Sequence, residues 1–141
     1  MLDMLLALGM ALVCIFLHFE AVLLIEKVAV RMRSVRMSLL ATWTGLLFAH
    51  VVEIWLYALV YFACAQAGVG QLHGVTSFID YGYYSAVVYT TLGFGDVVPD
   101  PGLHMLTGSE ALVGLSLIAW SATITYGRVL LHQSNGNNNG S

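Results

Sequence analysis

Three long apolar stretches dominate the chain, and each is interrupted by only a few ionisable positions. They run over residues 4–25, 37–67 and 103–131. A helix rises 1.5 Å per residue, so about 20 residues cross the roughly 30 Å hydrocarbon core of a bilayer. The pattern therefore predicts an all-α integral membrane protein with three transmembrane helices per chain.

A shorter element is predicted between the second and third stretches. After a loop over 68–76, the Ser-Phe-Ile-Asp sequence at 77–80 fits a capping box that begins a helix. The helix expected over 80–91 has only about three turns before Gly93 and Gly95 interrupt helical geometry. Half a crossing followed by irregular backbone is typical of a re-entrant loop, which enters and leaves the membrane on one face.

The composition agrees with a lipid environment. Hydrophobic residues make up 59 % of the chain, charged residues 9 %, and the mean hydropathy is +0.82, whereas soluble domains carry about a quarter charged residues. The net charge of −3 offers no basic surface for nucleic acid. Two cysteines within apolar runs indicate buried thiols and no disulfide framework.

The basic residues predict the orientation. Three crossings and one re-entrant loop place all 5 Lys and Arg residues on a single face. By the positive-inside rule this face is cytoplasmic, so we expect a multi-pass protein of the cell (inner) membrane with its N-terminus and re-entrant loop outside. Arg128 is expected to reach lipid phosphates. The basic residues are Lys27, Arg31, Arg33, Arg36 and Arg128.

The segment after the short helix carries the chemistry. Residues 89–96 are Tyr-Thr-Thr-Leu-Gly-Phe-Gly-Asp. Irregular backbone at membrane depth is tolerated where its carbonyls face protein, water or an ion. Two alternate glycines allow φ of either sign, so the carbonyls of residues 91–94 and the Thr91 hydroxyl can face one axis. A ring of oxygens needs several chains, which implies closed symmetry, and a tetramer is the obvious solution.

The sequence at 91–96, Thr-Leu-Gly-Phe-Gly-Asp, is similar to the Thr-Val-Gly-Tyr-Gly-Asp filter signature of the potassium channel family. Residues 37–131 resemble the prokaryotic two-helix pore module of that family. The resemblance implies a homotetramer that conducts K⁺ passively and needs no cofactor or catalytic residue. It implies K⁺ binding by carbonyls of Thr91, Leu92, Gly93 and Phe94, and filter support from Gly95, Asp96, Tyr83 and Tyr84.

The sequence departs from the family signature at three positions. Leu92 replaces the commoner Val, and Phe94 lacks the Tyr hydroxyl that can brace the filter. Val87 stands where some bacterial members have an acid that pairs with the filter Asp. We therefore expect Asp96 to need another partner, and Glu110 is a candidate to brace the back of the filter.

Ionisable residues inside the membrane form a second candidate site. His50 and Glu53 lie at i and i+3 on one face of the second predicted helix, and such pairs are functional candidates by default. One hypothesis is a hydrogen-bonded pair that fixes the N-terminal helix, together with His18 or Glu20. The other is a proton-sensing or metal role that modulates gating.

Four positions of the third helix recur at helical spacing and form a mildly polar stripe suited to an aqueous cavity. The first of them lies near the usual hinge of the inner helix in the potassium channel family. Close packing by small residues explains the first and third nearly as well. The four residues are Gly114, Ile118, Ser121 and Thr125.

These observations divide the chain into an extra helix with a basic loop (1–36), a pore domain (37–133) and a low-complexity tail expected to be disordered (134–141). The favoured function is a potassium channel of four copies in a lipid bilayer. A less selective cation channel and a non-conducting regulatory or assembly subunit are the alternatives. An intramembrane metalloenzyme built on His18, Glu20, His50 and Glu53 has suitable ligand types without a spacing motif.

Overall fold

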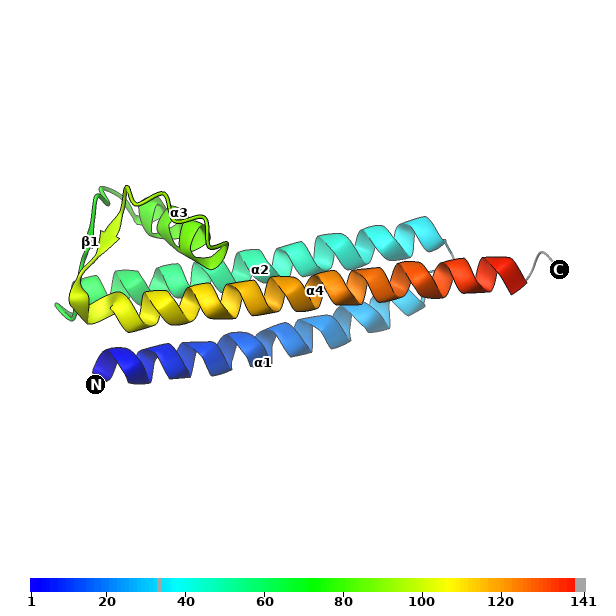
Figure 1. Cartoon of the computed structure of the whole chain (residues 1–141), viewed down its shortest axis with the longest axis horizontal. Helices are drawn as coiled ribbons and strands as arrows, with labels where there is room; N and C mark the ends of the chain where they lie inside the picture. Colours follow the sequence, from blue (N-terminus) through cyan, green and yellow to red (C-terminus); the bar gives the residue numbers. More distant parts are fainter. Residues whose placement is uncertain (33, 139–141) are drawn as a thin grey trace.

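Three long helices form the body of the molecule, and a short helix lies at one end (Figure 1). The computed structural model describes residues 1–32 and 34–138. The long helices are α1 (Leu2–Val30), α2 (Val35–Gln66) and α4 (His104–Asn138), and the short one is α3 (Phe78–Tyr89). The predicted all-α architecture is confirmed.

The long helices have the length and composition of membrane spans. The spans Leu2–Val30, Val35–Gln66 and Pro101–Leu130 reach mean hydropathies of 2.4, 1.8 and 1.3. All exceed the length needed to cross a bilayer. Large apolar side chains such as Phe48 and Leu112 are 69 % and 67 % exposed, as expected for surfaces that face lipid. The chain is a multi-pass membrane protein.

The end of α4 differs from the prediction. The helix continues to Asn138, so residues 134–138 are helical where their composition predicted the start of a disordered tail. Extending an existing helix costs far less free energy than nucleating one, which accounts for the difference. The rest of the predicted tail, 139–141, and the predicted basic residue Arg33 lie outside the described residues.

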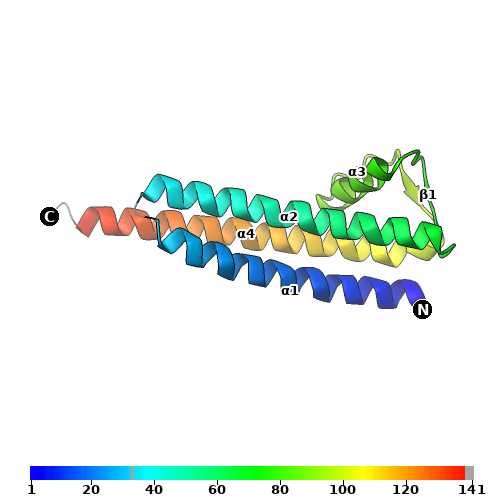
Figure 2. The same cartoon turned by 180° about the vertical axis from the view of Figure 1, so that it is seen from behind.

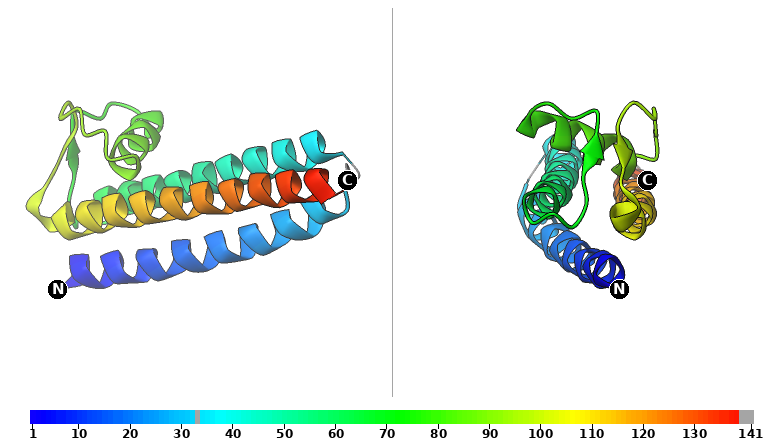
Figure 3. Two further views of the ribbon diagram at one scale, coloured as in Figure 1. Left: turned by 45° about the vertical axis from the view of Figure 1, so that its right-hand side comes forward. Right: turned by 90° about the vertical axis from the view of Figure 1, so that its left-hand side faces the viewer.

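Helices α1 and α3 flank the α2–α4 pair on opposite sides, as Figures 1, 2 and 3 show from different directions. Both α1 and α3 pack on α2 and α4. The extra N-terminal helix therefore lies on the side of the bundle away from the re-entrant segment.

Two acidic side chains shape the re-entrant segment. The predicted capping box of α3 is confirmed, with the Ser77 N–H donating to Asp80 Oδ2 at 2.7 Å and the Thr76 N–H at 2.6 Å. These bonds hold the pKa of the Asp80 carboxyl below its ordinary value. At the far end of the segment, Asp100 Oδ2 accepts the Gln71 N–H at 2.8 Å. This bond joins the loop that precedes α3 to the loop that leads into α4.

A small strand pair was missed by the sequence analysis, which predicted only an exposed loop. Strand β1 (Leu72–His73) pairs antiparallel with β2 (Val98–Pro99). A short 3-10 helix, η1 (Pro101–Leu103), then leads directly into α4. The strand pair thereby joins the loop before α3 to the loop after it. The chain leaves the bundle at the end of α2 and returns to the same end at the start of α4.

Helix α1 is attached to α4 near both of its ends. The Asp3 carboxylate accepts the backbone N–H groups of Met105 and Leu106, each at 2.9 Å, and so caps α4 from another helix. At the opposite end, Arg128 donates to Ser38 Oγ at 3.2 Å and lies 3.5 Å from Glu26 Oε1. The expectation that Arg128 reaches lipid phosphates is wrong, because its side chain is only 11 % exposed and turns into the helix bundle.

Candidate functional site: the filter segment and the buried network behind it

The segment after α3 has an alternating backbone. Thr91, Gly93 and Gly95 adopt positive φ angles of 58°, 55° and 77°, while Leu92 and Phe94 between them do not. Alternation of left-handed and right-handed residues directs successive carbonyls to one side of a strand, and glycine makes it possible at low cost. We call residues 91–96 the filter segment, after the family signature that their sequence resembles.

The beginning of the filter segment is tied to α3 through its N–H groups. The Leu92 and Gly93 N–H groups both donate to the Val87 carbonyl, at 2.9 and 3.3 Å, and the Thr91 N–H donates to Val88 O at 2.9 Å. Among the described residues, none of the hydrogen bonds ends on a carbonyl oxygen of residues 91–94. The segment therefore uses its donors internally and leaves its acceptors available.

The filter segment lies on an open face of the single chain. All of residues 91–96 are exposed, and the side chains of Leu92 and Phe94 are 58 % and 65 % exposed. One chain therefore presents the backbone of residues 91–96 on its surface and does not surround an ion with it.

Two tyrosines of α3 join this helix to the filter segment and to α4. Tyr83 donates its hydroxyl to Asp96 Oδ2 at 2.8 Å, so the partner that Asp96 needs in place of an acid at Val87 is a phenol. The Tyr84 hydroxyl lies 2.9 Å from Thr107 Oγ1 and joins α3 to α4. Both residues come from the aromatic pair that the sequence analysis placed beside the filter.

Glu110 does not reach the filter segment as predicted. It is fully buried on α4, accepts the Tyr61 hydroxyl of α2 at 2.6 Å and accepts the Ser85 hydroxyl of α3. The difference arises because Glu110 faces Ser85 in the middle of α3. Glu110 therefore joins α4 to α2 and α3, and no pattern in the sequence identifies its partners Tyr61 and Ser85.

The predicted stripe on α4 divides between two environments. A Cβ atom at Gly114 would lie 2.1 Å from the carbonyl oxygen of Tyr89, so only glycine permits this approach of α4 to the end of α3. Ser121 is buried against other helices, whereas Ile118 is 37 % exposed. Together with Thr125, Ser121 and Ile118 line a groove of about 500 Å³ between α2 and α4.

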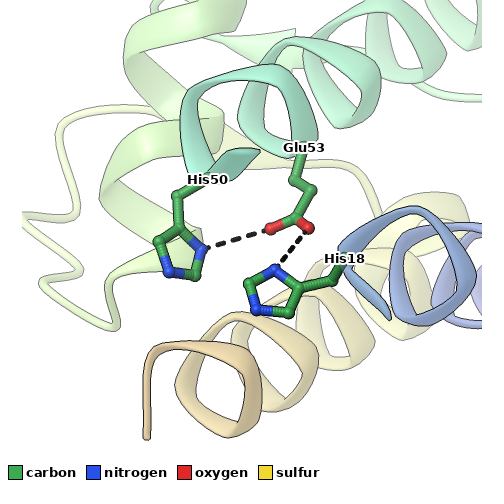
Figure 4. Close-up of side chains that lie close together, drawn as sticks. All are labelled: His18, His50 and Glu53. Atoms are coloured by element: carbon green, nitrogen blue, oxygen red, sulfur yellow. Dashed lines mark hydrogen bonds and ion pairs between the residues drawn. The ribbon is translucent and has the colours of Figure 1, made fainter. Parts of the chain in front are cut away.

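The ionisable pair of α2 acquires a third member from α1. Figure 4 shows His18 and His50 on either side of the Glu53 carboxylate, at 2.9 Å from Oε1 and 3.2 Å from Oε2. His18 is fully buried and Glu53 is 1 % exposed. Glu20, the other candidate on α1, is exposed and lies apart from them. We call His18, His50 and Glu53 the His–Glu cluster.

Two residues that the sequence analysis did not connect with this cluster complete it. Tyr89, the last residue of α3, donates its hydroxyl to Glu53, and the hydroxyl oxygen lies 2.9 Å from His50 Nδ1. Ser121 Oγ of α4 lies 3.0 Å from His50 Nε2 and 3.1 Å from His18 Nε2. The cluster therefore touches all four helices, and Tyr89 directly precedes the two threonines that lead into the filter segment.

A family model described as ion channel matches residues 49–130, which is more than half of the chain. The protein belongs to this ion channel family. The matched region contains most of α2, all of α3, the filter segment and α4 as far as residue 130, and α1 lies outside it. No curated protein and no solved structure matches the chain.

Proposed function

We propose that this ion channel is selective for K⁺ and that residues 91–94 of several copies form its selectivity filter. The observation that carries the proposal is the alternation of positive φ at Thr91, Gly93 and Gly95 within a re-entrant segment of an ion channel chain. This backbone favours stacked rings of carbonyl oxygens, which replace the hydration shell of a K⁺ ion.

The electrostatics of α3 favour a cation. The C-terminal end of a helix carries a partial negative charge, and α3 ends at Tyr89, just before the filter segment. None of residues 91–95 is charged, so the permeating ion meets neutral oxygens and the helix end. Ions would move passively down their electrochemical gradient, and repulsion between ions in adjacent sites would release each one from its site.

The exposed face of the filter segment supports a homotetramer. A line of oxygens on one chain cannot surround an ion, and closed cyclic symmetry supplies the other lines. Four copies around one axis would also cover Leu92 and Phe94, which are more than half exposed in the single chain. The filter segment and α1 lie on opposite sides of the α2–α4 pair, so α1 would be at the periphery (Figure 3).

The basic residues favour one orientation in the cell (inner) membrane. The connection between α1 and α2 lies at the end of the bundle opposite α3 (Figure 1), and Arg128 joins this end through Ser38 and Glu26. The positive-inside rule makes that end cytoplasmic and places the mouth of the filter and the N-terminus outside.

Ion flux into proteoliposomes tests the proposal. We expect K⁺ and Rb⁺ uptake to exceed Na⁺ uptake strongly in the wild type, and native mass spectrometry to give four chains. Gly93→Ala should abolish the uptake, because φ at this position is +55°. Gly108→Ala is the matched control, since a Cβ there has no neighbour within 4 Å.

The alternative outcomes identify the competing functions. Equal K⁺ and Na⁺ uptake would show a less selective cation channel. A tetramer that passes no ion under any pH or voltage would favour a non-conducting subunit.

A further inference from the structure

The His–Glu cluster has the geometry of a metal site. One ligand atom each from His18, His50 and Glu53 lies within 4.8 Å of the other two. In a tetrahedral site with bonds of about 2.1 Å, neighbouring ligand atoms lie about 3.4 Å apart. Here His18 Nδ1 lies 2.9 Å from Glu53 Oε1 and His50 Nδ1 lies 3.2 Å from Glu53 Oε2, so each nitrogen is near this separation from one oxygen of the carboxylate. Two imidazoles and a carboxylate are a known ligand set of zinc.

The hydrogen-bond partners show that the cluster lacks one donor when both imidazoles are neutral and Tyr89 donates to Glu53. If each Nδ1–H donates to Glu53, both Nε2 atoms are acceptors, and both face the hydroxyl of Ser121 at 3.0 and 3.1 Å. A hydroxyl has one proton and can donate to only one of them. One contact would then join two lone pairs in a buried site, which is unfavourable.

A metal ion at the Nδ1 atoms removes this conflict. The imidazole protons then lie on Nε2, and both N–H groups donate to Ser121 Oγ, which has two lone pairs. Hydrogen bonds of this kind from the second ring nitrogen orient metal-bound histidines. The positions of the two rings around a single serine therefore fit a metal site.

Tyr89 supplies an oxygen for the remaining position of a tetrahedron. Its hydroxyl oxygen lies 2.9 Å from His50 Nδ1 and is hydrogen-bonded to Glu53. With Tyr89 ionised, the charges of Glu53 and Tyr89 balance those of a divalent ion, and one phenolic proton leaves on binding.

We propose that His18, His50, Glu53 and Tyr89 bind a divalent transition metal ion of the zinc class, one per chain. The proposal does not depend on K⁺ selectivity. The metal would fix α1, which lies outside the matched ion channel region, to α2 of the pore. Through Tyr89 it would also hold the end of α3 from which the filter segment begins.

Metal titration of the full chain tests the proposal. The protein is purified in detergent with a tag free of histidine, stripped with a chelator and titrated with ZnCl₂ and CoCl₂. We expect one ion per chain, proton release on binding, and the visible absorption of tetrahedral Co²⁺. X-ray absorption of the zinc form should show two imidazole ligands, and this measurement needs no variant.

Variants locate the ion. His18→Ala and His50→Ala should each weaken binding by more than about 10-fold, and Ser121→Ala by about 10- to 100-fold as a group that orients the ligands. Glu53→Gln keeps the shape of the side chain and should also weaken binding. The matched control replaces His73 and His104, which are exposed, by Ala and should leave the affinity unchanged.

Three outcomes would overturn the proposal. The first is a wild type that binds no stoichiometric metal, and the second is binding that survives both His18→Ala and His50→Ala. The third is a thermal stability that responds to pH and not to Zn²⁺, which would show that the cluster takes an extra proton in place of a metal.

Discussion

The Tyr83 hydroxyl donates a 2.8 Å hydrogen bond to Asp96 Oδ2 and joins α3 to the end of the filter segment. Phe94 has no hydroxyl and Val87 no carboxyl, so the two braces expected from the potassium channel resemblance are missing from this chain. Tyr83 and Asp96 form a brace between the same two parts of the structure.

Replacing Tyr83 by Phe should destabilise the filter without unfolding the protein. The ring remains and only the bond to Asp96 is lost, so we expect conduction that declines faster during sustained activity, most strongly in low K⁺. Single-channel recording in bilayers measures this decline. Tyr126→Phe is the control, because Tyr126 is 64 % exposed on α4, away from the filter segment. Equal behaviour of the two variants would contradict the brace.

Removing the carboxylate of Glu110 should destabilise the helix bundle. Glu110→Ala removes the Glu110 acceptor from the hydroxyls of Tyr61 and Ser85, and each hydrogen bond lost costs about 0.5–1.5 kcal/mol. Ser85 keeps its 2.7 Å bond to the Ile54 carbonyl, and Tyr61 keeps Thr107 Oγ1 at 3.3 Å. Glu110→Gln keeps one acceptor oxygen and should lose less. Thermal unfolding of the purified protein measures both variants, and the order Ala below Gln below wild type is the expected result. An unchanged midpoint for Glu110→Ala would show that this network does not stabilise the fold.

A single methyl group at Gly114 should separate α4 from α3. The added Cβ would lie 2.1 Å from Tyr89 O, and overpacking of this kind costs about 1–3 kcal/mol. At Gly108 on the same helix the added Cβ has no neighbour within 4 Å, so Gly108→Ala should stabilise the helix by up to about 1 kcal/mol. Opposite shifts of the two unfolding midpoints are expected. Equal shifts would mean that α3 and α4 do not approach so closely.

The contacts of Asp100 predict a pH dependence outside the membrane-spanning helices. The hydrogen bond from His73, followed by the Gln71 N–H, lowers the pKa of Asp100 from its ordinary value of 3.8. A lowered pKa in the folded state means that these contacts stabilise the fold above pH 3.8 and are lost as the pH falls through the lowered value. Hydrogen-exchange protection of the Gln71 amide should follow this course. Asp100→Asn should remove the pH dependence, and its persistence in that variant would assign it to another group.

The helices and the capping box could be predicted from the sequence because they depend on local signals. Apolar runs of membrane length and the Ser77 to Asp80 spacing act within a few turns of the chain. The strand pair could not be predicted, since Leu72 and Pro99 are distant in the sequence and only two residues of each strand take part.

The hydrogen-bond partners of the buried acids also could not be predicted from the sequence. His18 and Glu20 were equivalent candidates for the cluster, and the rotation of α1 about its axis, which packing determines, selected His18. The same holds for Glu110, whose partners Tyr61 and Ser85 lie on two other helices. Residue types were identified from the sequence, and their pairing required the packed structure.

The reversal potential of the wild-type channel in a planar bilayer tests the central claim most directly. With K⁺ on one side and Na⁺ at the same concentration on the other, a filter built from carbonyls of residues 91–94 should drive the potential far toward the K⁺ equilibrium value. Gly108→Ala should reproduce the wild-type potential, since its Cβ has no neighbour within 4 Å. A reversal potential near zero in this gradient would contradict the account.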